Sequence, residues 1–259
     1  MSVRNLLDLS GKTAIVTGGS RGIGLQMATA LGEMGAKVAL TARKQDELDE
    51  SRAELERAGI ECHTIAGDLS NFDVIPGIVA SVLSRWGGID ILVNNAGCNW
   101  GAPAEDYPND GWRKVMNLNV DAAFFLCREV GKRAMLPNKS GKIVNIASIA
   151  GLFGNPPEWG MGTMAYNTSK GALIAMTRTL AAEWGPHNIN VNAICPGFFP
   201  SKMTRVTLDR IGADVLRLTP LGRLGGDEDL KGSVVFLASE ASRHVTGQTL
   251  AVDGGCSAI

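Results

Sequence analysis

Two residues four positions apart, Tyr166 and Lys170, have side chains suited to proton transfer. The segment 171–184 carries apolar residues at helical spacing, so a helix that begins near Thr163 would place both side chains on one face. An ammonium ~4 Å from a phenol is worth roughly 4 kcal/mol at an effective dielectric constant near 20, which would lower the tyrosine pKa from about 10 toward neutrality. Such a tyrosine can give or take a proton at working pH. The same spacing also occurs in helices without any chemistry, so the rest of the chain must decide.

A second candidate site is a glycine loop, in which Gly18, Gly22 and Gly24 follow a β-rich run over 12–17 and precede a helical pattern over 25–34. Glycines let a phosphate approach the backbone N–H groups at a helix N-terminus. The spacing is G-x-x-x-G-x-G, and no Gly-Lys-Ser/Thr follows, so this loop is not a P-loop. The pattern predicts a site for the phosphates of a dinucleotide.

The end of the second predicted strand indicates which dinucleotide binds. An acid at this position would hold the ribose hydroxyls of NAD, but the chain has Arg43 and Lys44 there. A guanidinium binds phosphate bidentately, and Arg21 in the glycine loop could add a second cation. We therefore predict NADP(H) over NAD(H). The alternative is that Arg43 and Lys44 are the solvated start of a charged helix.

Strand and helix patterns alternate along the whole chain. Strands are predicted over 12–17, 37–41, 61–66, 89–93, 142–147, 189–194 and 248–252, and helices over 25–34, 45–58, 75–86, within 112–135, from about 163 to 184, and over 227–237. This alternation predicts an α/β fold, a single-domain doubly wound parallel sheet (Rossmann-like) with helices on both faces, spanning 1–259. Ligands of such folds bind beyond the carboxyl ends of the strands.

The composition argues against several functions. The 259 residues carry a net charge of −1, which offers no electrostatic case for nucleic acid or an anionic membrane. No apolar run is long enough to span a bilayer, and residues 1–10 lack the apolar core of a signal peptide. Five scattered cysteines without a CxxC motif indicate a reduced, cytoplasmic protein. The three histidines are far apart, so no metal site is expected.

Together these motifs resemble the short-chain dehydrogenase/reductase family. The resemblance rests on Thr17 to Gly24, Asn94-Asn95-Ala96-Gly97, Ser148, Tyr166 with Lys170, and Pro196-Gly197, and it extends from about Leu9 to Gly255. It implies a nicotinamide cofactor, hydride transfer between this cofactor and a carbonyl or secondary alcohol, and a homotetramer built through the helices at 112–135 and 166–184.

The resemblance also assigns roles to single residues. Tyr166 matches the general acid/base, Lys170 the lysine that lowers the tyrosine pKa and holds the nicotinamide ribose, and Ser148 the residue that hydrogen-bonds the substrate oxygen. Asn119 matches the asparagine that supports a proton relay through water to the lysine, and Asp68 the acid near the adenine. The cofactor-binding residues implied are Gly18, Ser20, Arg21, Gly22, Ile23, Gly24, Arg43, Asp68, Leu69, Asn95, Ala96, Gly97, Tyr166, Lys170, Pro196, Gly197 and Phe199.

Two segments depart from the family pattern and are predicted to cover the substrate. The segment near 152–162 makes the spacing from Ser148 to Tyr166 longer than usual, and Trp159 in it either forms a substrate wall or packs on a neighbouring subunit. The segment near 198–225 mixes apolar and basic residues, which suggests a partly hydrophobic substrate, with or without an acidic group. Cys98 is interpreted as a small packing residue, because no histidine is suitably placed in the sequence to activate it.

Within the family the chain is most similar to bacterial 3-ketoacyl thioester reductases, including the rhamnolipid-type branch, through features such as Trp100, Trp112 and the stretch Phe199 to Thr204. Similarity to gluconate 5-dehydrogenase-type enzymes is nearly as good. The expected function is reduction of a 3-ketoacyl thioester or similar carbonyl, with a sugar-acid or polyol dehydrogenase as the alternative. A non-catalytic dinucleotide sensor on the same fold is the remote alternative.

Overall fold

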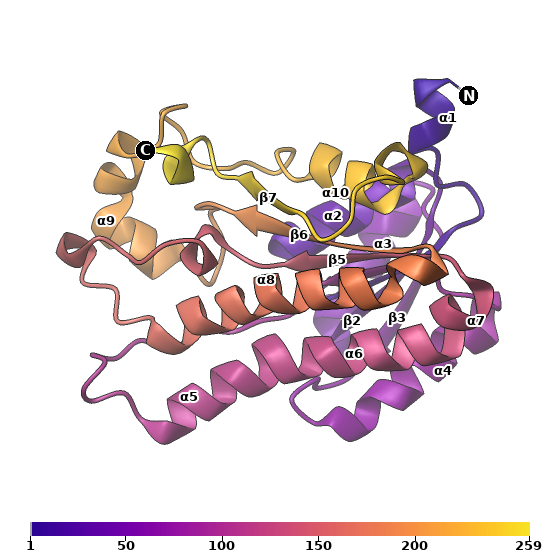
Figure 1. Cartoon of the computed structure of the whole chain (residues 1–259), viewed down its shortest axis with the longest axis horizontal. Helices are drawn as coiled ribbons and strands as arrows, with labels where there is room; N and C mark the ends of the chain where they lie inside the picture. The colour runs from indigo at the N-terminus through magenta and orange to yellow at the C-terminus, as the bar shows by residue number, and fades with distance from the viewer. Residues whose placement is uncertain (1) are drawn as a thin grey trace.

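The computed structural model describes residues 2–259, which form one seven-stranded parallel sheet in the order β3-β2-β1-β4-β5-β6-β7 (Figure 1). The strands β1, β2, β4, β5 and β6 are mostly buried, as expected for a sheet covered on both faces, whereas β3 at the edge is only partly buried. The predicted doubly wound parallel sheet is confirmed. The strands are β1 (Thr13–Thr17), β2 (Lys37–Ala42), β3 (Cys62–Ala66), β4 (Ile91–Asn94), β5 (Gly141–Ile146), β6 (Ile189–Pro196) and β7 (Thr249–Val252).

Two helical layers cover the sheet (Figure 1). One hydrophobic core joins α2 (Gly22–Glu33), α3 (Gln45–Arg57) and α10 (Lys231–Ala238) to one face. The other joins α4 (Ile75–Trp86), α6 (Ala122–Val130) and α8 (Met164–Trp184) to the opposite face. Each helix turns an apolar stripe to the sheet, such as Ile75, Ile78, Val79 and Val82 on α4. Because all seven strands run parallel, their carboxyl ends lie at one edge of the sheet.

The long helix predicted within 112–135 is a continuous helical run that contains two π-helical turns. Its parts are α5 (Asn109–Met116), a π-helix over Asn117–Asp121, α6, a second π-helix over Gly131–Met135, and α7 (Leu136–Asn138). A π-helical turn shifts the hydrogen-bond pattern by one residue and is often found at functional sites. The first turn carries Asn119, whose side chain is 1% exposed.

Two helices were not predicted, α1 (Val3–Leu7) and α9 (Arg205–Arg217). The last helix also begins at Lys231, four residues later than expected. Asp229 explains the delay, because its carboxylate accepts the Gly226 N–H at 2.7 Å and pairs with Arg223, which holds residues 226–230 in a turn. Helix α9 lies in the segment 198–225 and is the structured part of the predicted substrate cover.

Candidate active site

Ser148, Tyr166 and Lys170 come together at the carboxyl edge of the sheet. Tyr166 and Lys170 lie in the first two turns of α8, and the Lys170 Nζ is 5.5 Å from the centre of the Tyr166 ring. Ser148 follows β5 directly and is buried, with its Oγ accepting the Ala150 N–H at 3.1 Å. Lys170 donates a hydrogen bond to the Ile146 carbonyl oxygen at 2.7 Å. The end of β5 and the start of α8 therefore position all three side chains.

The electrostatics of the pair differ from the prediction. Burial raises the pKa of Tyr166, and the nearby Ser148 hydroxyl acts in the opposite direction. Burial lowers the pKa of Lys170 to about 8. The predicted lowering of the Tyr166 pKa by Lys170 is wrong for this structure, because both groups lose water and the ammonium lies over the ring and bonds Ile146.

Asn119 reaches this centre from the π-helical turn. Its Oδ1 accepts the Cys98 N–H at 2.8 Å, and its Nδ2 donates to the Cys98 carbonyl at 3.0 Å and to the Ser169 Oγ at 3.0 Å. Ser169 in turn donates to the Tyr166 carbonyl oxygen at 2.7 Å. Sequence reasoning missed Ser169, although it stands beside Lys170 in the motif. The side-chain amide of Asn119 is thus used to hold the neighbouring backbone.

The glycine loop connects β1 to α2 and is hydrogen-bonded to the residues that follow β4. Gly18 has a φ of +61°, and Asn95 donates from Nδ2 to the carbonyl oxygens of Thr17 and Gly18 at 2.8 and 3.1 Å. A side chain at Gly24 would overlap the Gly18 carbonyl and the Asn95 amide, whereas Gly22 faces open space. The Thr17 hydroxyl, which the sequence did not single out, accepts the N–H groups of Asn95 and Ala96, both at 2.9 Å.

This arrangement fits a dinucleotide. Gly22, with nothing within 4 Å of where a side chain would stand, opens α2, and the N-terminus of this helix is suited to phosphate. Gly97 leads from the loop to the catalytic centre, because a Cβ on it would lie 3.2 Å from the Asn119 Oδ1 and 3.7 Å from the Lys170 Nζ. Gly97 therefore lies beside both Asn119 and Lys170, and it follows Asn95, whose side chain bonds the glycine loop.

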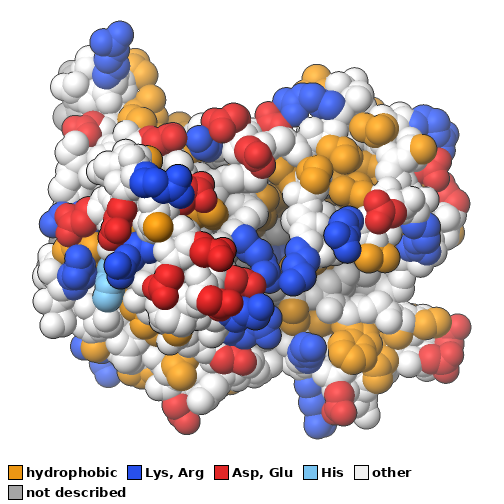
Figure 2. Space-filling view, turned by 180° about the vertical axis from the view of Figure 1, so that it is seen from behind, with side chains coloured by type: hydrophobic (Ala, Val, Ile, Leu, Met, Phe, Trp, Pro, Cys, Tyr) orange, Lys and Arg blue, Asp and Glu red, His pale blue; other side chains and the backbone are white. Residues whose placement is uncertain are grey.

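The predicted adenosine end lies after β2 and β3. Arg43 is exposed, whereas Arg21 pairs with Glu47 at 2.7 Å. The pKa of Asp68 lies below its usual value, mainly because its carboxylate accepts hydrogen bonds from Ser70 and to a smaller extent because of the nearby charge of Arg43. Leu69 is buried. Figure 2 shows Lys and Arg side chains gathered around a hollow in this face, with Asp and Glu side chains beside them. At this end the exposed guanidinium of Arg43 suits an anionic group.

The residues after β6 lie on the other side of the centre. The Gly197 N–H donates to the Val252 carbonyl at 3.0 Å, which continues the pairing of β6 with β7 beyond Pro196. The Phe199 side chain is 6% exposed and packs in the sheet core and against Gly225. The Phe199 ring is therefore a core residue and is not exposed to a cofactor.

Comparison with known proteins assigns the chain to a family. A family model described as enoyl-(acyl carrier protein) reductase matches residues 18–257. Gluconate 5-dehydrogenase of Gluconobacter oxydans is 41% identical over 257 residues, which cover 98% of each chain. The chain belongs to the short-chain dehydrogenase/reductase family. The predicted family and the predicted enzyme class, an oxidoreductase, are confirmed.

Two further short-chain dehydrogenase/reductase relatives represent both predicted branches. The rhamnolipids biosynthesis 3-oxoacyl-[acyl-carrier-protein] reductase of Pseudomonas aeruginosa is 38% identical, with 96% of this chain and 97% of that protein covered. The crystal structure of a gluconate 5-dehydrogenase from Burkholderia cenocepacia in complex with NADP and tartrate has a TM-score of 0.93 at 32% identity, with full coverage of both chains.

In this short-chain dehydrogenase/reductase, Trp159 lies at the centre of the contacts between the segment 152–162 and α9. Its side chain is 1% exposed and packs edge-to-face on Phe198, with ring centres 5.6 Å apart, and on Ile211 and Val215 of α9. The alternative that Trp159 packs on a neighbouring subunit is wrong, because its indole is buried inside its own chain beneath α9. The substrate wall stays a prediction. The Gly160 carbonyl also accepts from Arg210 at 3.4 Å. The segment 152–162 and α9 are thus packed together.

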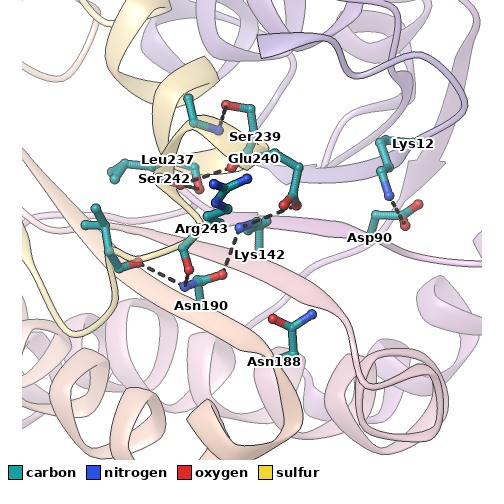
Figure 3. Close-up of polar contacts among 12 residues, drawn as sticks. Lys12, Asp90, Lys142, Asn188, Asn190, Leu237, Ser239, Glu240, Ser242 and Arg243 are labelled. Carbon is teal, nitrogen blue, oxygen red and sulfur yellow. Dashed lines mark hydrogen bonds and ion pairs between the residues drawn. The ribbon is translucent and has the colours of Figure 1, made fainter. Parts of the chain in front are cut away.

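A second buried lysine shows what distinguishes Lys170. Lys142, at the amino end of β5, donates to the Asn190 Oδ1 at 2.8 Å and lies 3.8 Å from a Glu240 carboxylate oxygen (Figure 3). Lys170 has one acceptor among residues 2–259, the Ile146 carbonyl, although an ammonium has three donors. Lys142 thus has a carboxylate counter-charge and an amide acceptor, whereas Lys170 has one neutral acceptor and two donors to spare.

Neither a metal centre nor a membrane span is found in the described part of the chain. Within residues 2–259, no three His, Cys, Asp or Glu side chains group as ion ligands would. None of the helices in that range combines the length and the apolar character needed to cross a bilayer.

The Cys98 Sγ lies 3.7 Å from the Lys114 carbonyl, and burial raises the pKa of this thiol, so it stays protonated near neutral pH.

Proposed function

We propose that this protein uses NADP(H) to interconvert a ketone and a secondary alcohol at the centre formed by Ser148, Tyr166 and Lys170. The observation that carries the proposal is the convergence of these side chains beside Gly97, at the same edge of the sheet as the glycine loop. When bound, the nicotinamide supplies the hydride. The protein supplies position and the proton.

Each side chain has one task. The Ser148 hydroxyl, fixed by the Ala150 N–H, holds the substrate oxygen beside the Tyr166 hydroxyl. Tyr166 gives its proton to this oxygen in reduction and removes it in oxidation. The spare donors of Lys170 hold the ribose hydroxyls next to the nicotinamide. Asn119 keeps Cys98 and Ser169 in place and so fixes the backbone around the tyrosine.

The remaining predicted residues hold the cofactor. Gly18, Ser20, Gly22, Ile23 and Gly24 contact its phosphates, and Asp68 and Leu69 contact the adenine. Asn95, Ala96 and Gly97 line the middle of the surface, and Pro196, Gly197 and the Phe199 backbone line the nicotinamide end. Arg43 and Arg21 lie at the adenosine end, where they favour a 2′-phosphate, and solved relatives contain NADP.

The substrate proposed is a 3-ketoacyl thioester or a similar carbonyl with an apolar arm. Apolar side chains stay exposed on the two covering segments, namely Leu152 at 44%, Met203 at 50% and Val206 at 75%. An exposed apolar border of this kind suits an acyl chain. A sugar acid is the second candidate, because a relative named gluconate 5-dehydrogenase is 41% identical over 98% of both chains.

Turnover assays separate the candidates. NADPH oxidation is measured with acetoacetyl thioester, 5-ketogluconate and a bulky ketone, for the wild type and Tyr166→Phe. The expected result is the highest kcat/KM with the thioester and a loss of roughly 10³-fold or more in Tyr166→Phe, with NADPH binding retained. Higher kcat/KM for 5-ketogluconate would support the sugar-acid candidate. No turnover of any carbonyl, despite tight NADPH binding, would indicate a non-catalytic sensor.

We further propose a cytoplasmic homotetramer of single-domain subunits whose segments 152–162 and 198–225 cover the substrate. The five cysteines are free thiols, which suits a reducing compartment. Trp112 on α5 and Phe124 on α6 are 38% and 41% exposed, so the long helical run presents apolar area to a second copy. Light scattering after gel filtration tests the tetramer, and a monomer would refute it.

A further inference from the structure

One carboxylate lies among the cations at the adenosine end of the cofactor surface. The Glu47 Oε1 is 2.7 Å from the Arg21 Nη1 and 3.1 Å from the Lys44 Nζ, and its Oε2 accepts from the Ser20 hydroxyl at 3.4 Å. The Glu47 side chain is 23% exposed. Lys44, followed by Arg21, holds the pKa of Glu47 below its usual range, so the carboxylate is ionised at neutral pH.

These three partners are the donors that a phosphate would use. Two cations and a hydroxyl converge on a single anion, and they come from the glycine loop and from the start of α3. The buried Ser51 hydroxyl lies between the same two elements, with its Oγ 2.8 Å from the Ser20 carbonyl oxygen and 2.7 Å from the Glu47 carbonyl oxygen, and its single proton can go to either. The loop and the helix therefore hold Glu47 in register with Arg21.

Arg43 differs from Arg21 in this respect. It is exposed and has no ion pair or hydrogen bond within residues 2–259. A 2′-phosphate near the ends of β1 and β2 can pair with Arg43 directly. To pair with Arg21 or Lys44, it competes with the carboxylate of Glu47, which already pairs with both. A 2′-hydroxyl, which is neutral, leaves all contacts of Glu47 intact.

We infer that Glu47 is an internal counter-anion that competes with the 2′-phosphate of NADP(H) for Arg21 and Lys44. The inference rests on the proposed cofactor. Glu47 lowers the preference for NADP(H) over NAD(H) and leaves NAD(H) usable as a second cofactor. The preference that remains comes mainly from Arg43.

The test is the binding of both reduced cofactors to Glu47→Gln, which keeps the side-chain length and removes the charge. Dissociation constants of NADPH and NADH are measured by the change in cofactor fluorescence at low ionic strength. A unit charge ~6 Å from a phosphate, at an effective dielectric constant of 40 to 80, corresponds to a roughly three- to tenfold change in affinity. We expect NADPH to bind tighter by this factor, with NADH almost unchanged.

A matched control and a second variant isolate the cause. Glu50→Gln makes the same charge change at an exposed position of α3 and is expected to leave the ratio of the two dissociation constants near its wild-type value. In an Arg21→Met background, the gain from Glu47→Gln should shrink by at least half, since the released cation is no longer there.

An unchanged ratio in Glu47→Gln overturns the inference. Weaker NADPH binding in this variant also overturns it and indicates instead that Glu47 positions Arg21 for the phosphate. If the wild type binds neither cofactor, the proposed function itself fails, and the inference fails with it. A wild type that binds NADPH, together with a variant that shows no gain, refutes the inference alone.

Discussion

Replacing Trp159 by alanine should loosen the proposed substrate cover, segments 152–162 and 198–225, without unfolding the sheet. The indole is 1% exposed and belongs to a small cluster with Ile211 and Val215 of α9, bordered by Phe198. This cluster is separate from the two cores that flank the sheet. The contacts of Trp159 therefore hold the segment 152–162 to α9, and their loss acts there first.

The size of the effect follows from burial. Truncating a buried tryptophan to alanine costs about 3–5 kcal/mol. If the whole cost falls on the local opening of α9, the equilibrium constant for this opening rises by roughly 10²- to 5 × 10³-fold, up to the limit set by the local stability of the helix. Trp159→Phe is the matched control, because the indole N–H has no acceptor in the described chain. Removing an unpaired buried donor relieves about 1–3 kcal/mol, which offsets the lost volume.

Hydrogen exchange measures this opening directly. Amides of α9, residues 205–217, should exchange much faster in Trp159→Ala, whereas amides of β5 keep their wild-type rates and Trp159→Phe stays close to the wild type. The KM for the ketone should rise several-fold in Trp159→Ala with NADPH binding unchanged. Equal protection of α9 in the wild type and in Trp159→Ala would refute the packing argument, as would faster exchange throughout the sheet.

Two further predictions concern the cofactor surface and the buried lysine. Gly24→Ala should weaken NADPH binding at least tenfold, because its methyl group overlaps the Gly18 carbonyl and the Asn95 amide, whereas Gly232→Ala on α10 has open space and should not; equal dissociation constants for the two variants would contradict this. Since the pKa of Lys170 is lowered to about 8, the folded state binds fewer protons than the unfolded state between pH 8 and 10.5, and stability from this group rises with pH. In urea unfolding without cofactor, the free energy of unfolding of the wild type, relative to that of Lys170→Met, should rise by up to about 3 kcal/mol from pH 8 to pH 10.5. A difference independent of pH would rule out the lowered pKa.

Much of the fold was predictable because its signals are local. The buried strands are continuous apolar runs, and their order along the chain alternates with helical patterns. Helix α9 was not predicted, because the segment 198–225 was interpreted as a variable cover. The helical spacing of its apolar residues Ile211 and Val215 was not considered. The late start of α10 depends on Asp229 bonding Gly226 and Arg223, a contact that periodicity does not report.

The site was predictable at the level of residues and less so at the level of energies. Tyr166, Lys170 and Ser148 could be named because their spacing follows strand ends and helical turns. The sign of the tyrosine pKa change could not, because it depends on how much water each group loses and on which atom the ammonium bonds. Ser169 and Thr17 were missed for a related reason, since their hydroxyls act through partners that are distant in sequence.

By itself, the sequence determined the parallel sheet, the glycine loop and the residue types of a proton-transfer centre, because these follow from local periodicity, from backbone freedom at glycine and from side-chain chemistry. Only the tertiary structure decided the pairing of Arg21 with Glu47, the burial of Trp159 under α9 and the spare donors of Lys170. These features depend on contacts between elements that lie far apart in the chain or on the water each group has lost, and neither quantity is encoded in residue spacing.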